Sequence, residues 1–132
     1  MNSLQTLDLS CNQIETINEN TFCGLNNFLI LWLFNNKITA INENLFNGLE
    51  SLQTLDLSGN QITSISENTF NGLITLQKLY LHNNRIESIN EVTFEGLDSL
   101  QDLKLDNNQI TSKNDLSIAF KRTLPNCLHL II

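Results

Sequence analysis

The sequence repeats itself with a period of 24 residues, and this period restricts the possible folds more than any other feature of the chain. A shift by one period aligns two columns of leucine, at Leu7, Leu31, Leu55, Leu79 and Leu103 and at Leu9, Leu33, Leu57, Leu81 and Leu105. A single unit of this length cannot bury its own leucines. The units must therefore stack on one another to form a common core.

Each unit carries its two leucines two residues apart, which places them on the same face of a short β-strand. Stacked strands about 4.8 Å apart form a parallel sheet, and columns of isoleucine and phenylalanine close the core from the other side. The short unit leaves little room for a helix, so we expect loops and short 3₁₀ turns opposite the sheet. The predicted fold is an α/β solenoid in a single domain, residues 1–132, with five repeats starting near 4, 28, 52, 76 and 100 and a partial sixth near 127.

A column of asparagine follows the strands, where the chain turns away from the sheet, at Asn12, Asn36, Asn60, Asn84 and Asn108. Backbone groups inside the coil lack partners at this point, and a carboxamide supplies both a donor and an acceptor. We interpret the column as a buried ladder of hydrogen bonds between coils. The alternative is that each asparagine serves only as a turn former.

The complete unit reads LxxLxLxxNxIxxIxxxxFxGLxx. It resembles the typical 24-residue leucine-rich repeat, which is found in Toll-like receptors and small leucine-rich proteoglycans, and the resemblance covers nearly the whole chain. The resemblance implies a right-handed horseshoe with the parallel sheet on its concave face. It also implies a ligand on that face and favours an extracellular or cell-surface origin.

Unit five departs from the pattern. Lys113 stands where the second isoleucine is expected, and the next strand signature follows after 27 residues, which indicates an insertion of three residues. We expect Asn114 or Asp115 to cap a short helix that Pro125 ends. The apolar side of that helix is predicted to consist of Leu116, Ala119 or Phe120, and Leu124.

Both ends of the repeat array are expected to be open, because solenoids normally need capping units with a polar outer face. Leu4 stands near the start of the pattern, and Ile132 ends the chain in the middle of a unit. One interpretation is end-to-end self-association through an open end. The interpretation that we favour is that the chain is a segment of a longer protein.

The residues that alternate with the strand leucines point away from the core and form the variable concave surface. Unit two places Ile30, Trp32 and Phe34 there, which makes an exposed apolar patch of the kind that marks an interaction site. We predict that Trp32, Phe34, Tyr80 and His82 anchor a protein partner, because aromatic residues are favoured binding anchors. The alternative is a patch that packs against flanking sequence. The full predicted partner-binding set is Asp8, Ile30, Trp32, Phe34, Asp56, Lys78, Tyr80, His82, Asp102 and Lys104.

Three hypotheses of function follow. The first is a module that recognises a protein or another ligand on the concave sheet, and the second is a structural solenoid that stacks end to end. The third is a hydrolase, because Ser58, His82 and Asp106 fall in one column on three successive strands. An open sheet offers no shielded pocket and no spare backbone donors for an oxyanion, so we predict no enzymatic activity and no cofactor. His82 and His129 are too isolated for a metal site.

The formal net charge of -7 argues against a nucleic-acid partner, because phosphate binding needs a basic surface. We expect no membrane insertion, since the longest strongly apolar run, residues 28–34, is too short to span a bilayer, and no signal segment opens the chain.

The three cysteines form no disulfide or metal pattern, and the redox state of Cys11 and Cys23 stays open. Cys127 occupies a leucine position, where we expect a buried and inert thiol.

Overall fold

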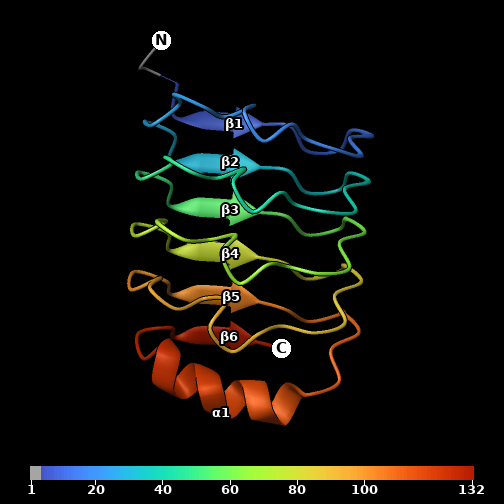
Figure 1. The fold of residues 1–132 in the computed structure, drawn as a ribbon, viewed down its shortest axis with the longest axis vertical. Helices are drawn as coiled ribbons and strands as arrows, with labels where there is room; N and C mark the ends of the chain where they lie inside the picture. The colour runs from blue at the N-terminus through green and yellow to red at the C-terminus, as the bar shows by residue number, and fades with distance from the viewer. Residues whose placement is uncertain (1–3) are drawn as a thin grey trace.

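The computed structural model describes residues 4–132, and these residues form a stack of coils joined by one parallel sheet (Figure 1). The sheet has six strands that lie in chain order, β1-β2-β3-β4-β5-β6. Their bounds are Thr6–Asp8 for β1, Ile30–Trp32 for β2, Thr54–Asp56 for β3, Lys78–Tyr80 for β4, Asp102–Lys104 for β5 and His129–Ile131 for β6. The parallel-sheet solenoid predicted from the repeat is confirmed.

The register of the sheet follows the sequence period. Leu7 pairs with Leu31, Leu31 with Leu55, and Leu55 with Leu79. In each coil the two strand leucines, such as Leu31 and Leu33, point into the stack, and the residue between them points outward. From the second coil to the fifth these leucines are almost completely buried. The alternation of two residues therefore separates a core face from an outer face on every strand.

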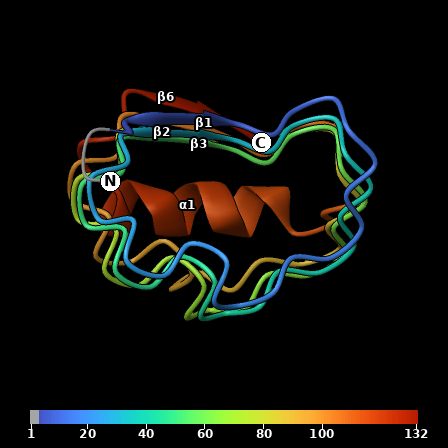
Figure 2. The same ribbon diagram turned by 90° about the horizontal axis from the view of Figure 1, so that it is seen from above.

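Phenylalanines form a second column inside the stack, opposite the sheet. The rings of Phe46 and Phe70 stack with centroids 6.2 Å apart, and those of Phe70 and Phe94 with centroids 5.8 Å apart. Seen from above, the coils superpose, with the sheet along one side and turns along the other (Figure 2). The core lies between these two sides.

The side opposite the sheet consists of turns closed by short-range hydrogen bonds. In the second coil, Leu45 N–H donates to Asn42 O and Leu49 N–H donates to Phe46 O, both across three residues. Each of these segments contains a glycine with positive φ, such as Gly72 at φ 86°. This backbone conformation is one that residues with a Cβ rarely adopt, which explains why glycine recurs there.

The asparagine column joins each coil to the one before it. Asn60 Nδ2 donates to Leu33 O at 3.1 Å and to Leu57 O at 3.0 Å, while Asn60 Oδ1 accepts from Ile38 N–H at 3.1 Å. The same three bonds recur at Asn36, Asn84 and Asn108. Asn12, in the first coil, is exposed, and among residues 4–132 it bonds only within its own coil, to Leu9 O and Ser10 O.

The helix α1, Lys113–Thr123, lies across the C-terminal end of the stack (Figures 1 and 2). Its apolar side buries Leu116, Ala119 and Phe120, and the Phe120 ring contacts Phe94 edge to face at 5.5 Å. The expectation of two open ends is therefore corrected in part at this end: the inserted residues fold back over the core of the fifth coil, while Leu130 and Ile132 of the last strand and its end are only half-buried. The helix starts at Lys113 after Ser112, which makes no side-chain cap bond, so the predicted caps Asn114 and Asp115 lie inside the helix.

The first coil differs from the others because no coil lies against its outer side among residues 4–132. Leu7, Leu9, Ile14 and Leu25 occupy core columns but are only half-buried, whereas Leu31 in the second coil is fully buried. Leu4 is exposed. An apolar surface is therefore accessible at this end of the described chain.

Cys127 is half-buried, which corrects the expectation of a buried thiol. It lies just before β6, the last strand, so no further coil covers its outer side among the described residues. Partial burial raises the pKa of the Cys127 thiol, and backbone hydrogen bonds from His129 and Leu103, which stabilise the thiolate, partly oppose this. Cys11 and Cys23 are free and exposed.

Candidate partner-binding face

The outer side of the sheet, called here the sheet face, is formed by three columns of residues that alternate with the strand leucines. Its central column reads Asp8, Trp32, Asp56, Tyr80, Lys104 and Ile131, one residue from each strand in register. Successive residues of a column are separated by the interstrand distance of about 4.8 Å. Side chains far apart in sequence therefore become neighbours on this face.

Strand β2 gives the sheet face its most apolar row. Ile30 and Trp32 lie in the strand, Phe34 follows it, and all three are half-buried. The rings of Trp32 and Phe34 meet edge to face, with centroids 6.3 Å apart and planes at 64°. This contact holds the two rings together as one partly exposed apolar surface.

The strands on either side of β2 carry the same sequence, Thr-Leu-Asp-Leu-Ser, in residues 6–10 and 54–58. In β3, Asp56 Oδ1 accepts hydrogen bonds from Ser58 N–H at 2.9 Å and from Ser58 Oγ at 2.6 Å. Asp8 and Ser10 repeat this arrangement next to β1. These bonds lower the pKa of the Asp8 carboxyl. The bond from the Ser10 hydroxyl has the larger effect, and the bond from the Ser10 backbone N–H has the smaller one.

A second aromatic pair lies on β4. The Tyr80 and His82 rings meet edge to face with centroids 6.0 Å apart, and Lys104 Nζ lies 5.1 Å from the centroid of the Tyr80 ring. Burial raises the pKa of the Tyr80 hydroxyl, with further contributions from the negative charges of Asp102 and Asp56. The ammonium of Lys104 thus occupies the position where a cation is attracted by the ring.

All ten residues of the predicted partner-binding set lie on the sheet face, on strands β1 to β5 or directly after them. Asp8 and Lys78 are exposed, and the other eight are half-buried. The structure brings them together as one continuous surface. Their role in binding a partner stays a prediction.

The column of Ser58, His82 and Asp106 does not form a chain of hydrogen bonds. Ser58 is buried and its hydroxyl bonds to Asp56, while His82 Nδ1 and Asp106 Oδ1 are buried without a hydrogen-bond partner. A serine nucleophile needs a base within hydrogen-bond reach. The geometry therefore gives no support to the hydrolase hypothesis.

Residues 4–132 contain no group of three histidine, cysteine, aspartate or glutamate side chains placed to hold a metal ion. Within the same residues, no helix has the length and apolar character needed to cross a bilayer.

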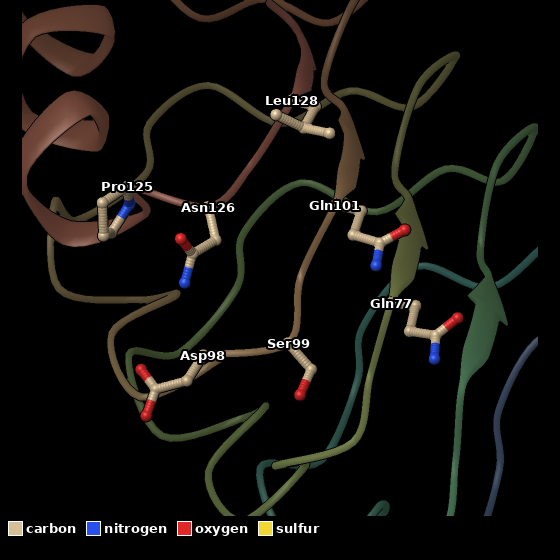
Figure 3. Close-up of a pocket in the computed structure, with 7 residues that line it drawn as sticks. All are labelled: Gln77, Asp98, Ser99, Gln101, Pro125, Asn126 and Leu128. Carbon is tan, nitrogen blue, oxygen red and sulfur yellow. The ribbon is translucent and has the colours of Figure 1, made fainter.

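A hollow of about 480 Å³ lies beside the sheet face, next to the amino ends of β4 to β6 (Figure 3). Its polar lining consists of Gln77, Asp98, Ser99, Gln101 and Asn126, and its apolar lining of Pro125 and Leu128. The hollow forms where the segment after α1 returns to the sheet. No sequence pattern predicted it, because it depends on how the three inserted residues fold.

Two features of the sheet face were also missed by reasoning from the sequence. The repeated Asp-x-Ser of units one and three is a readable signal for the Asp–Ser hydrogen bonds, since both side chains lie on the same face. The contact of Lys104 with Tyr80 has a weaker signal, a lysine one period after an aromatic residue.

Comparison with solved structures finds the same fold in proteins from several sources. A leucine-rich repeat protein of Leptospira interrogans is 32% identical with a TM-score of 0.83, over 99% of this chain and 32% of that chain. TLR13, in a complex with single-stranded RNA, is 36% identical with a TM-score of 0.79, over 84% of this chain and 16% of that one. Toll, in the Drosophila Toll–Spätzle complex, is 26% identical with a TM-score of 0.89, over 99% of this chain and 19% of that one.

The chain thus spans about a third or less of the length of these solved proteins. None of the curated protein sequences matches it. The model of the leucine-rich repeat family matches residues 1–38, 29–85 and 74–119, which together cover most of the chain. With the repeat, the sheet and the asparagine bonds already described, these matches show that the chain belongs to the leucine-rich repeat family.

Proposed function

We propose that this chain is a recognition module that binds a protein partner on its sheet face. The observation that carries the proposal is the row of Ile30, Trp32 and Phe34, which leaves apolar and aromatic surface accessible on a rigid sheet. Tyr80 and His82 add a second aromatic pair about 10 Å away, two strands along the sheet. Large aromatic side chains in such positions contribute much of the binding energy at protein interfaces.

The solved relatives support recognition as the general role, since Toll is seen with Spätzle and TLR13 with RNA. For this chain the charges favour a protein over RNA. The sheet face carries two lysines, Lys78 and Lys104, against four aspartates at positions 8, 56, 102 and 106. A phosphate backbone needs an excess of basic side chains, and this face has an excess of acidic ones.

The proposal is tested with a protein that is isolated by its binding to the parent chain. Its affinity is measured for the parent chain and for the variants Trp32→Ala and Tyr80→Ala. Each variant is expected to weaken binding about 30-fold, the effect of losing an interface anchor. Ile74→Ala serves as the control, because Ile74 is an exposed apolar residue outside the strands. A partner that binds both aromatic variants as tightly as the parent chain contradicts the proposal.

A second candidate is self-association through the first coil. Leu4 is exposed there, and core-column residues such as Leu7 and Leu9 are half-buried. Because α1 covers the other end of the stack, we expect pairing of two first coils instead of an open filament. Light scattering tests this: the mass should rise with concentration in the parent chain and stay monomeric in Leu4→Asp. A parent chain that is monomeric at high concentration excludes it.

A further inference from the structure

Trp32 lies between two aspartates on the sheet face. It is in register with Asp8 on β1 and with Asp56 on β3. Each neighbour is one interstrand distance away, about 4.8 Å, so the three side chains form a short row across the sheet. The Asp8–Trp32–Asp56 row thus combines an aromatic ring with a carboxylate on either side.

Hydrogen bonds fix both carboxylates of this row. Ser10 and Ser58 each donate a backbone N–H and a hydroxyl to Oδ1 of the aspartate two residues earlier. The second oxygen of each aspartate takes no part in these bonds. The Ser10 hydroxyl and then the Ser10 backbone N–H lower the pKa of the Asp8 carboxyl, because both bonds stabilise its charged form. The Trp32 ring is positioned in turn by its edge contact with Phe34.

The same face contains an aromatic ring that already has a cation. Tyr80 is in register with Asp56 on one side and Lys104 on the other, and the Lys104 ammonium lies over the Tyr80 ring. The Trp32 row has no counterpart of Lys104, because its neighbours on both strands are aspartates. The first basic residue in the chain is Lys37, in the turn beyond β2. Among residues 4–132, the row therefore has the environment of a cation site without a basic residue in register beside Trp32.

We propose that the Asp8–Trp32–Asp56 row binds a basic side chain of the partner, and that arginine fits it best. This inference rests on the proposed function and specifies the chemistry of the partner. Tryptophan attracts a cation more strongly than tyrosine or phenylalanine. The planar guanidinium of arginine stacks on an aromatic ring while its N–H groups pair with carboxylates, which the compact ammonium of lysine does less well.

The chain has a single tryptophan, so its intrinsic fluorescence reports directly on this row. The probes are the short peptides acetyl-Gly-Arg-Gly-amide and acetyl-Gly-citrulline-Gly-amide, which have nearly the same shape and differ in charge. The arginine peptide should change the Trp32 emission in a saturable way at millimolar concentration. The citrulline peptide should bind at least fivefold more weakly, and added salt should weaken only the arginine peptide.

The variant Asp8→Asn/Asp56→Asn removes both charges but keeps an Oδ1 acceptor for Ser10 and Ser58. It should reduce the affinity for the arginine peptide to that for the citrulline peptide. The control Glu15→Gln/Glu19→Gln removes two charges from exposed residues of the first coil outside the strands and should bind arginine like the parent chain. Circular dichroism checks that both variants melt like the parent chain.

Equal binding of the two peptides, or an unchanged affinity in the Asn variant, overturns the inference. This result is distinct from failure of the proposed function, because the peptides report on the row without any partner. If Trp32→Ala weakens partner binding while the peptides bind alike, the sheet face is the binding surface but the row does not select arginine. If the arginine peptide binds selectively while Trp32→Ala leaves partner binding unchanged, the row takes arginine but the partner binds elsewhere.

Discussion

The side chain of Asn60 donates a hydrogen bond to the carbonyl of Leu33, 27 residues earlier in the chain and one coil away. Asn60 is buried, and it also donates to Leu57 O and Ser58 O and accepts from Ile38 N–H. One amide therefore satisfies backbone groups in two neighbouring coils. This relationship recurs at three further asparagines, so it contributes to stability along the whole stack.

Replacing Asn60 with alanine should lower the free energy of unfolding by about 3 kcal/mol, because buried backbone groups lose their partners. Asn12→Ala is the matched control. Asn12 is exposed and makes no bond to another coil within the described residues, so its loss should change stability by less than about 1 kcal/mol. Urea denaturation of the two variants measures the difference. Equal effects would contradict a role of the ladder in joining the coils.

Thr69 and Thr93 bury their hydroxyls without a hydrogen-bond partner. In the second coil the same column holds Leu45, which is buried as well, so the site accepts an apolar side chain. Thr69→Val and Thr93→Val should each raise the free energy of unfolding by about 1 kcal/mol, since the desolvated hydroxyl is removed without loss of shape. Thr21 in the first coil is exposed, and Thr21→Val should have almost no effect. A melting temperature lowered by Thr69→Val would refute this reasoning.

Gly59 and Gly72 both have positive φ, but they should respond differently to substitution. Gly59 aligns with Asn35, Asn83 and Asn107, which have φ between 54° and 58°, and its own φ is 67°. A Cβ on Gly59 would meet Asn35 Oδ1, the end of a flexible side chain that can rotate away. Gly59→Asn should therefore be nearly neutral and should allow a bond like that between Asn107 and Asn83, which measures 2.8 Å.

Gly72 lies at φ 86°, and no atom beyond its chain neighbours lies within 4 Å of the point where a Cβ would stand. Gly72→Ala should still destabilise the chain by about 1–2 kcal/mol, because the backbone conformation itself disfavours a side chain. Thermal denaturation of Gly59→Asn and Gly72→Ala compares the two sites. A larger loss for Gly59→Asn would show that crowding, and not backbone strain, limits these positions.

Tyr80 is the only tyrosine, so its ionisation can be followed by tyrosinate absorbance. Its midpoint should lie above 10.0, because burial and the charges of Asp102 and Asp56 raise the pKa. The raised pKa means that Tyr80 favours the folded state below pH 10 and that this contribution is lost as the pH rises through the folded-state pKa. Asp102→Asn should move the midpoint toward 10.0, whereas Asp98→Asn should leave it unchanged. Ionisation of Tyr80 at or below pH 10 would rule out this environment.

The strands could be predicted from the sequence because their information is local and repeated. The alternation around Leu31 or Leu55 defines the core face, and one period of 24 residues gives the register that the sheet shows. The placement of Trp32 and Tyr80 on the outer face follows from the same alternation. The helix over the C-terminal end was also predictable in outline, since Leu116, Ala119 and Phe120 have helical spacing.

What could not be predicted depends on particular side chains or on chain segments outside the repeat. The start of α1 at Lys113 and the half-buried state of Cys127 depend on how the inserted residues pack against the last strand. The position of Lys104 over Tyr80 depends on side-chain conformations that the alignment of the repeats does not specify. The hollow lined by Gln101 and Asn126 depends both on the packing of the inserted residues and on side-chain conformations.

The asparagine bonds also indicate how such a chain can change its length. Excising one whole period, such as residues 52–75, would bring Asn84 into the place of Asn60 opposite Leu33, so each broken bond would re-form with an equivalent partner. A gene that loses or duplicates complete coils by unequal recombination therefore needs no new packing. A deletion within a coil has to be absorbed by the segment opposite the sheet, as α1 absorbs the three inserted residues before β6 pairs in register with β5. For this reason the architecture favours evolution in whole units.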